Sequence, residues 1–139
     1  MDARGFVISF RMAASAPVLA MFAQVVLAGL AFSDSAIALT AHMLNGAAAV
    51  LASAVQTGFA VLLWRWREVP RWPLIASVAV LAGELSQMVS GRFHVSALHL
   101  PLGVGLFGAL TVLVFSAWSL RLERAATGLS VEHRGGSCA

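Results

Sequence analysis

Two histidines, His42 and His99, stand near the start of long apolar stretches, and each is followed four residues later by a glycine, Gly46 and Gly103. Ionisable side chains are costly inside a bilayer, so they mark candidate functional positions there. Imidazole is also the commonest metal ligand among protein side chains. Both stretches are expected to begin at the same side of a membrane. The two imidazoles are then expected at one depth, where they could bind a single metal.

The composition is typical of a membrane protein. Of the 139 residues, 60% are apolar and 11% are charged, and the mean hydropathy is +0.87, which leaves too little polar surface for a water-soluble globule. Crossing a hydrocarbon core takes about 20 helical residues, and four windows are long enough, at residues 13–32, 37–64, 72–90 and 97–120. The predicted fold class is therefore all-α: a bundle of four transmembrane helices in one domain over residues 1–127, followed by a disordered tail over residues 128–139.

The distribution of arginine predicts the orientation in the membrane. The chain has nine arginines and no lysine, and only Arg92 falls on the side opposite the other eight. The positive-inside rule then places both termini in the cytoplasm and the two histidines near the outer face. The expected location is the inner (plasma) membrane, as a multi-pass protein whose first span is retained. No basic stripe on a soluble face indicates nucleic-acid binding, and the lipid bilayer is the expected partner of the Trp- and Arg-rich residues 65–72.

A short pattern occurs twice along the chain. Gln24 precedes His42 and Gln87 precedes His99, with a glycine between the two residues in each case. A parallel repeat of two helices has a pseudo-two-fold axis along the membrane normal, which would place the histidines symmetrically about it. Chance similarity is the alternative. Symmetric imidazoles suit the two axial positions of a haem.

Four further residues are candidates for contacts with such a cofactor. Gly46 and Gly103, one turn below the histidines, would leave room for a flat ligand. Glu84 is the only acidic residue within a predicted span, and we expect it to be protonated or hydrogen-bonded to a histidine or to another polar group. Arg92 would favour haem propionates near the outer face.

The same residues also have plainer interpretations. Intramembrane histidine and glutamine can simply join helices by hydrogen bonds, and Arg92 can reach lipid headgroups. Two rival functions therefore stay open. One is a non-haem membrane subunit or assembly factor. The other is a transporter or relay unit in which His42, His99 and Glu84 bind a divalent metal or protons.

The order of glutamine, short outer loop, histidine and small residue resembles one four-helix half of haem A synthase, over most of residues 17–120. In that family the second and fourth helices of each half supply the histidines that bind haem, which implies His42 and His99 here. The family's oxidative chemistry uses a glutamate three residues before a histidine, where this chain has Leu39 and Ser96, and a cysteine pair in the first outer loop, which is missing. The resemblance therefore does not extend to synthase activity. The chain is also similar to small four-helix membrane cytochromes b.

We therefore expect a small integral-membrane protein that binds haem b. The expected axial ligands are His42 and His99, and the residues expected around the cofactor are Gln24, Gly46, Glu84, Gln87, Arg92 and Gly103. With both axial positions filled, electron transfer or haem holding is favoured over catalysis. The expected partners are a quinol or a larger membrane redox complex, and a homodimer is a further expectation.

Overall fold

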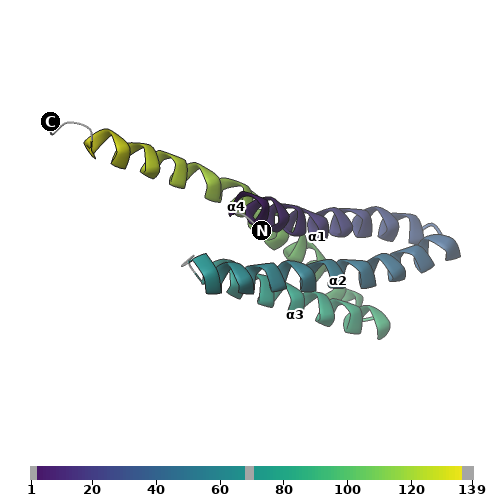
Figure 1. Cartoon of the computed structure of the whole chain (residues 1–139). Coiled ribbons are helices and arrows are strands. Elements are labelled where there is room, and N and C mark those ends of the chain that lie inside the picture. The colour runs from purple at the N-terminus through teal and green to yellow at the C-terminus, as the bar shows by residue number, and fades with distance from the viewer. Residues whose placement is uncertain (1–2, 68–70, 136–139) are drawn as a thin grey trace.

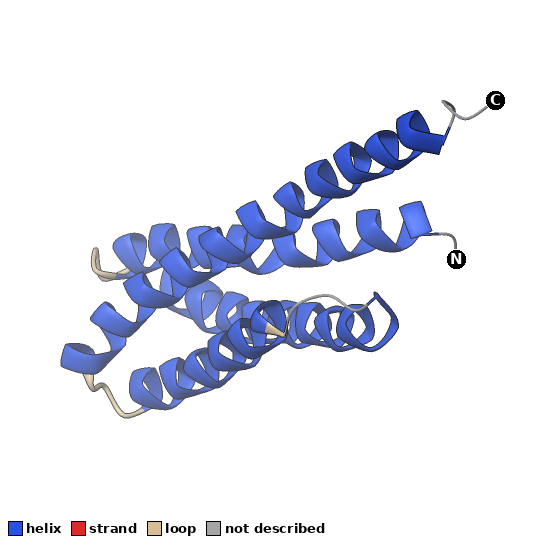
Figure 2. Ribbon diagram, turned by 90° about the vertical axis from the view of Figure 1, so that its left-hand side faces the viewer, coloured by secondary structure: helices blue, strands red, loops and turns tan. Residues whose placement is uncertain are grey.

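Four helices follow one another in the computed structural model, which describes residues 3–67 and 71–135 (Figure 1 and Figure 2). They are α1 (Ala3–Ala31), α2 (Ala36–Arg67), α3 (Trp72–Arg92) and α4 (Ser96–Gly135), and the described residues contain no strand. The stretches long and apolar enough to cross a membrane are Ile8–Ala31, Ala36–Arg65, Trp72–Arg92 and Ser96–Ser119. The predicted all-α bundle of four spans is confirmed, and the chain is a multi-pass membrane protein.

Short turns join α1 to α2 and α3 to α4, and both lie at the same end of the bundle, here called the hairpin end (Figure 1). Each turn contains one residue with a left-handed backbone, Asp34 with φ 57° and His94 with φ 56°. Asp and His are among the residues that tolerate this conformation best. Ser35 then caps α2, because its Oγ accepts a hydrogen bond from the Ala38 amide at 3.2 Å.

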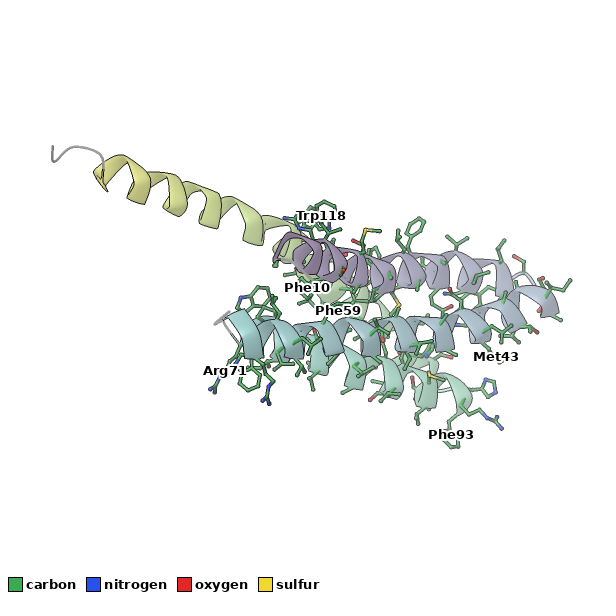
Figure 3. All side chains as sticks on the ribbon, in the orientation of Figure 1. Phe10, Met43, Phe59, Arg71, Phe93 and Trp118 are labelled. Atoms are coloured by element: carbon green, nitrogen blue, oxygen red, sulfur yellow. The ribbon has the colours of Figure 1, made fainter. Side chains whose placement is uncertain are left out.

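Each helix packs against its neighbours in sequence, and α4 closes the bundle against α1, so α2 and α4 lie diagonally opposite each other. Apolar packing is concentrated away from the hairpin end. One buried cluster consists of Phe10, Ala14, Ala60, Leu63 and Ala117, and a second consists of Met21, Val80, Leu106, Leu110 and Leu113. Figure 3 shows Phe10 and Trp118 far from Met43 and Phe93, which lie toward the hairpin end.

The outside of the bundle is apolar. Large side chains such as Ile37, Val104 and Phe115 are exposed, at 84%, 74% and 72% of their surface. A soluble protein would not present so extensive an apolar surface to water. These side chains contact lipid when the helices span a bilayer.

Arg11 fixes α1 to the end of the apolar stretch of α4. Its guanidinium donates to the backbone oxygens of Ala117 (3.4 Å) and Trp118 (2.9 Å) and lies 4.9 Å from the centre of the Trp118 ring. Both carbonyl groups lie in the interior of α4, so the bonds from the guanidinium add to those of the helix itself. A buried arginine, 6% exposed, thereby serves as a packing element.

The last helix extends further than the sequence predicts. We expected a disordered tail from Gly128, whereas α4 continues to Gly135. Residues 120–135 include leucine, glutamate, arginine and alanine, which have high helix propensity and can continue a helix beyond the apolar stretch. The remainder of the predicted tail, including Cys138, lies outside the described residues.

Candidate functional site

The two histidines singled out in the sequence face each other across the bundle. His42 comes from α2 and His99 from the diagonally opposite α4, and their ring centroids are 6.2 Å apart with the planes inclined at 60°. His42 is the seventh residue of α2 and His99 is the fourth residue of α4, so they lie about two turns and about one turn from the hairpin end. The expectation that the two imidazoles share one depth is met by this contact.

Each imidazole is held in the same way by the preceding helix. His42 Nδ1 lies 3.3 Å from the backbone oxygen of Gln24, and His99 Nδ1 lies 3.0 Å from that of Gln87. A carbonyl oxygen only accepts hydrogen bonds, so both Nδ1 atoms must donate. The lone pair of each ring is then on Nε2, which has no hydrogen-bond partner among the described residues. Metal-bound histidines usually donate their second nitrogen in this way.

Ser90 adds a contact to His99 that sequence reasoning missed. Its Oγ donates to the Gln87 oxygen (3.0 Å) and lies 3.2 Å from His99 Nδ1. Gly91 lets the ring approach α3, because a Cβ there would lie 3.0 Å from His99 Cε1. The sequence signal was available, since a polar residue directly before a glycine stands at the end of the third span.

The glycines below the histidines accommodate glutamine side chains. A Cβ on Gly46 would lie 3.0 Å from Gln24 Nε2, and a Cβ on Gly103 would lie 2.6 Å from Gln87 Nε2. We expected this space to receive a flat ligand. In the structure it holds the two glutamine amides, so the glycines belong to the helix contact that supports each imidazole.

The glutamine amides differ in their own partners. Asn45 donates from Nδ2 to Gln24 Oε1 (2.9 Å) and to the Ala20 oxygen (2.8 Å). Gln87 donates from Nε2 to the His99 oxygen (2.7 Å), while its Oε1 is buried without a partner among the described residues. Asn45 was missed at the sequence level, although an asparagine one turn from His42 inside a span is itself a signal.

Glu84 lies apart from both histidines. Its Oε1 accepts a hydrogen bond from Ser53 Oγ of α2 at 2.9 Å, and a second α2–α3 contact joins Gln56 to Ser77 at 3.3 Å. All four side chains are buried, at 1 to 3% exposure. Of the two partners considered from the sequence, a histidine or another polar group, the structure contains the second.

The candidate residue Arg92 and two neighbours at the hairpin end are on the surface. Arg92 ends α3 and is exposed, and His94 is an exposed turn residue. Met43, adjacent to His42, is 59% exposed and lies on the outside of α2 (Figure 3). Of these side chains, none contacts the histidine pair, and Arg92 is the one near the predicted membrane surface that could meet an anionic group.

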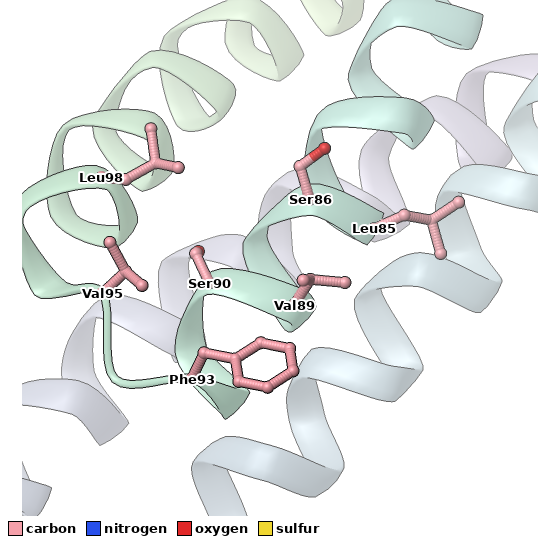
Figure 4. Close-up of a pocket in the computed structure, with 7 residues that line it drawn as sticks. All are labelled: Leu85, Ser86, Val89, Ser90, Phe93, Val95 and Leu98. Carbon is pink, nitrogen blue, oxygen red and sulfur yellow. The ribbon is translucent and has the colours of Figure 1, made fainter.

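A lipid-facing groove lies beside His99, between α3 and the start of α4 (Figure 4). Its volume is about 420 Å³. The groove is lined by Leu85, Ser86, Val89, Ser90, Phe93, Val95 and Leu98. Ser90 therefore joins the wall of the groove to His99 Nδ1.

The donor set limits which metals the pair can hold. Within residues 3–67 and 71–135 no group of three or more His, Cys, Asp or Glu side chains could hold a metal ion. Zinc sites need three or four protein ligands, whereas a haem needs only one or two axial ligands because the porphyrin supplies the others. Two isolated imidazoles fit the second requirement.

Comparisons with protein-family models, curated proteins and solved structures gave no match to this chain. The resemblance to haem A synthase consequently rests on the residues quoted above and on the four-helix topology.

Proposed function

We propose that this chain is a small membrane haem protein in which His42 and His99 would hold one haem b. The observation that carries the proposal is the pair of imidazoles on opposite helices, 6.2 Å apart between ring centroids. Two imidazoles on opposite sides of one metal would have centroids roughly 6 Å apart, since each metal–nitrogen bond is about 2 Å. The matched Nδ1 contacts with Gln24 and Gln87 support it, because they leave both Nε2 atoms available.

Haem bound in this way would supply one-electron chemistry, and two axial imidazoles would leave no position for oxygen or substrate. The chain's own residues would orient the ligands. Gln24 and Gln87 fix the tautomer of each ring through a backbone oxygen, and Arg92 is near enough to the hairpin end to neutralise propionates. Electron transfer or haem holding follows from this arrangement more readily than catalysis.

The proposed donor is a membrane quinol. The groove beside His99 supports this choice, because exposed apolar residues line it and only a lipid-soluble molecule reaches it within a bilayer. Phe93 offers a ring for stacking and Ser90 a hydroxyl at the wall nearest the histidine. A larger membrane redox complex would then accept the electron, and a homodimer of the chain is a further proposed assembly.

The proposed orientation has both termini in the cytoplasm of an inner (plasma) membrane. It is supported by the eight arginines on the terminal side of the bundle, against Arg92 alone at the hairpin end. The haem site would then face the outer leaflet.

An absorption spectrum of the purified protein, with extraction of its haem, tests the proposal. We expect a red preparation with a Soret band and the low-spin spectrum of a six-coordinate b-type haem. A colourless preparation with bound zinc or copper would replace it with the metal-relay function. A colourless, metal-free preparation that does not take up added haem would favour the function of a non-haem membrane subunit or assembly factor.

A further inference from the structure

The two hairpins differ at the level of their glutamine side chains. In the first, Asn45 donates to Gln24 Oε1. In the second, the residue three positions after the histidine is Leu102, which has no group to donate, and Gln87 Oε1 is left buried without a partner among the described residues. A buried acceptor of this kind points to a molecule that completes its hydrogen bond.

The second difference lies one turn away along α3. Three residues before Gln24 the first hairpin has Met21, whereas three residues before Gln87 the second has Glu84. Glu84 is 2% exposed, its Oε1 accepts from Ser53, and its Oε2 is buried without a partner in the described part of the chain. A spacing of three residues puts Glu84 and Gln87 on one helix face, about 4.5 Å apart along the axis.

The surroundings of Glu84 favour the uncharged acid. The α2 side chain that contacts it is Ser53, and the α4 side chain packed on adjacent Gly83 is Leu106. Gln56, one turn further along α2, bonds to Ser77, and its Oε1 is also buried without a partner among the described residues. Among the described residues, the other ionisable groups inside the bundle are the two histidines toward the hairpin end and Arg11 toward the other end. A carboxylate without a neighbouring cation is expensive in such a site.

The hydrogen-bond directions then follow from chemistry. The Ser53 hydroxyl donates to Glu84 Oε1, so the acid proton belongs on Oε2, which needs an acceptor. Gln87 Oε1 is an acceptor that needs a donor. A buried water usually makes about three hydrogen bonds to polar groups that would otherwise be unsatisfied. One water can accept from Glu84 and donate to Gln87.

We propose that Glu84 is a proton-binding acid of the membrane interior, joined to the histidine pair by a water held between Glu84 Oε2 and Gln87 Oε1. Gln87 completes the link, since it contacts His99 through both its backbone oxygen and its amide nitrogen. Positive charge gained at the histidine pair favours release of the Glu84 proton to this water and on to solvent, and loss of that charge favours its return. The coupling to charge rests on the proposed haem function, whereas the proton site itself does not.

Infrared spectroscopy of the purified protein tests the proton site whether or not haem is present. A protonated carboxyl has a C=O stretch resolved from that of a carboxylate, and it shifts when its proton exchanges for deuterium. We expect wild-type protein to show such a band, exchangeable in D₂O, and Glu84→Gln to lack it. If the wild-type protein shows no such band, or if the band is still present in Glu84→Gln, the proposal is overturned.

Two serine variants keep the test decisive if Glu84→Gln does not fold. Ser53→Ala removes the hydrogen bond to Oε1 and should shift the band, whereas Ser86→Ala removes an exposed hydroxyl of α3 that bonds only to Ala82 and should leave the band in place. Gln87→Leu should shift the band and slow its exchange, because the water loses its acceptor. Equal exchange in wild type and Gln87→Leu would refute the water link.

The haem-loaded protein gives a separate readout. Reduction should alter the Glu84 band, and the oxidised-minus-reduced spectrum of Glu84→Gln should lack that signal. A colourless protein that still shows the exchangeable band would refute the haem proposal and retain the proton site. A red protein without the band would support the haem proposal and refute the proton site.

Discussion

The hairpin α1–α2 and the hairpin α3–α4 hold their histidines alike and differ around them. In each, the backbone oxygen of a glutamine fixes Nδ1 of the imidazole, and a glycine on the following helix makes room for the glutamine amide. In the first hairpin Asn45 donates a hydrogen bond to the Gln24 amide oxygen. In the second, Gln87 Oε1, one turn from Glu84, is buried without a partner among the described residues. The shared contacts orient the two imidazoles, and the difference gives the second hairpin alone the side chains of the proposed proton site.

The same comparison separates the hairpin end of the bundle from the rest. Leucine, valine, alanine and phenylalanine fill the two buried clusters, while the histidine level is built from histidine, glutamine, asparagine, serine and glycine. Without a hydrophobic driving force between helices in lipid, packing and hydrogen bonds hold the bundle together. The apolar clusters can therefore support the fold without the polar side chains at the hairpin end.

The largest expected effect comes from breaking the ligand pair. His42→Ala and His99→Ala should each convert a low-spin haem into a high-spin one that binds carbon monoxide, because one axial position is opened. The double variant should be free of haem. Absorption spectra with and without carbon monoxide measure this, and exposed His94→Ala is the control that keeps the wild-type spectrum. Low-spin haem at full occupancy in either single variant would contradict the assignment.

A smaller effect is expected when the first hairpin is made to resemble the second. Asn45→Leu removes the donor to Gln24 Oε1 and an added bond to the Ala20 oxygen; the Gln24 acceptor is left unsatisfied, which should destabilise the bundle by about 1 to 3 kcal/mol. Unfolding in detergent mixtures measures the change. Exposed Met43→Leu is the matched control and should lie within about 0.5 kcal/mol of wild type. Equal stability of the two variants would mean that the Asn45 contacts contribute nothing.

The glycines should respond unequally to the same substitution. Alanine gains roughly 1 kcal/mol over glycine within a helix, and at Gly46 a small movement of the Gln24 amide can preserve that gain. At Gly103 the added Cβ would lie 2.6 Å from Gln87 Nε2 and displace its hydrogen bond with His99, which costs about 1 kcal/mol or more. We therefore expect Gly46→Ala to melt at a higher temperature than Gly103→Ala. A higher melting temperature for Gly103→Ala would show that an added Cβ does not disturb the Gln87 contact more than the Gln24 contact.

The smallest effect should appear at the lipid-facing groove. Val89→Trp fills part of the groove and should slow reduction by an added quinol while leaving the absorption spectrum unchanged. Val26→Trp, at the equivalent position after Gln24, also adds an indole to an exposed site, and quinol should reduce the haem of this variant at the wild-type rate. Stopped-flow reduction compares them. Equal rates in the two variants would remove this groove as the donor site.

The sequence predicted the four helices well because each span is a continuous apolar run of the length a bilayer requires. It also predicted the meeting of His42 and His99, since short turns force alternate helices to begin at one end of the bundle. The end of α4 was predicted less well. Gly128 and the polar residues around it suggested a stop, whereas neighbouring residues with high helix propensity continue the helix to Gly135.

Other assignments needed the packed helices. Periodicity put Glu84 on the polar face of α3 but could not choose between Ser53 and a histidine as its partner, because that depends on how α2 and α3 are rotated against each other. For the same reason, Gly46 and Gly103 gave no indication that glutamine amides would fill the space beside them.

The sequence by itself determined that this chain crosses a membrane four times, that two histidines occupy one level, and that a glutamine precedes each of them, because span length, turn length and order along the chain are local properties. The tertiary structure decided which nitrogen of each histidine is hydrogen-bonded and that Asn45 and Ser90 belong to the site. It also decided that Gln87 Oε1 and Glu84 Oε2 are buried without a hydrogen-bond partner among the described residues. Those features depend on the rotation and separation of neighbouring helices, which are set by contacts between residues distant in the sequence.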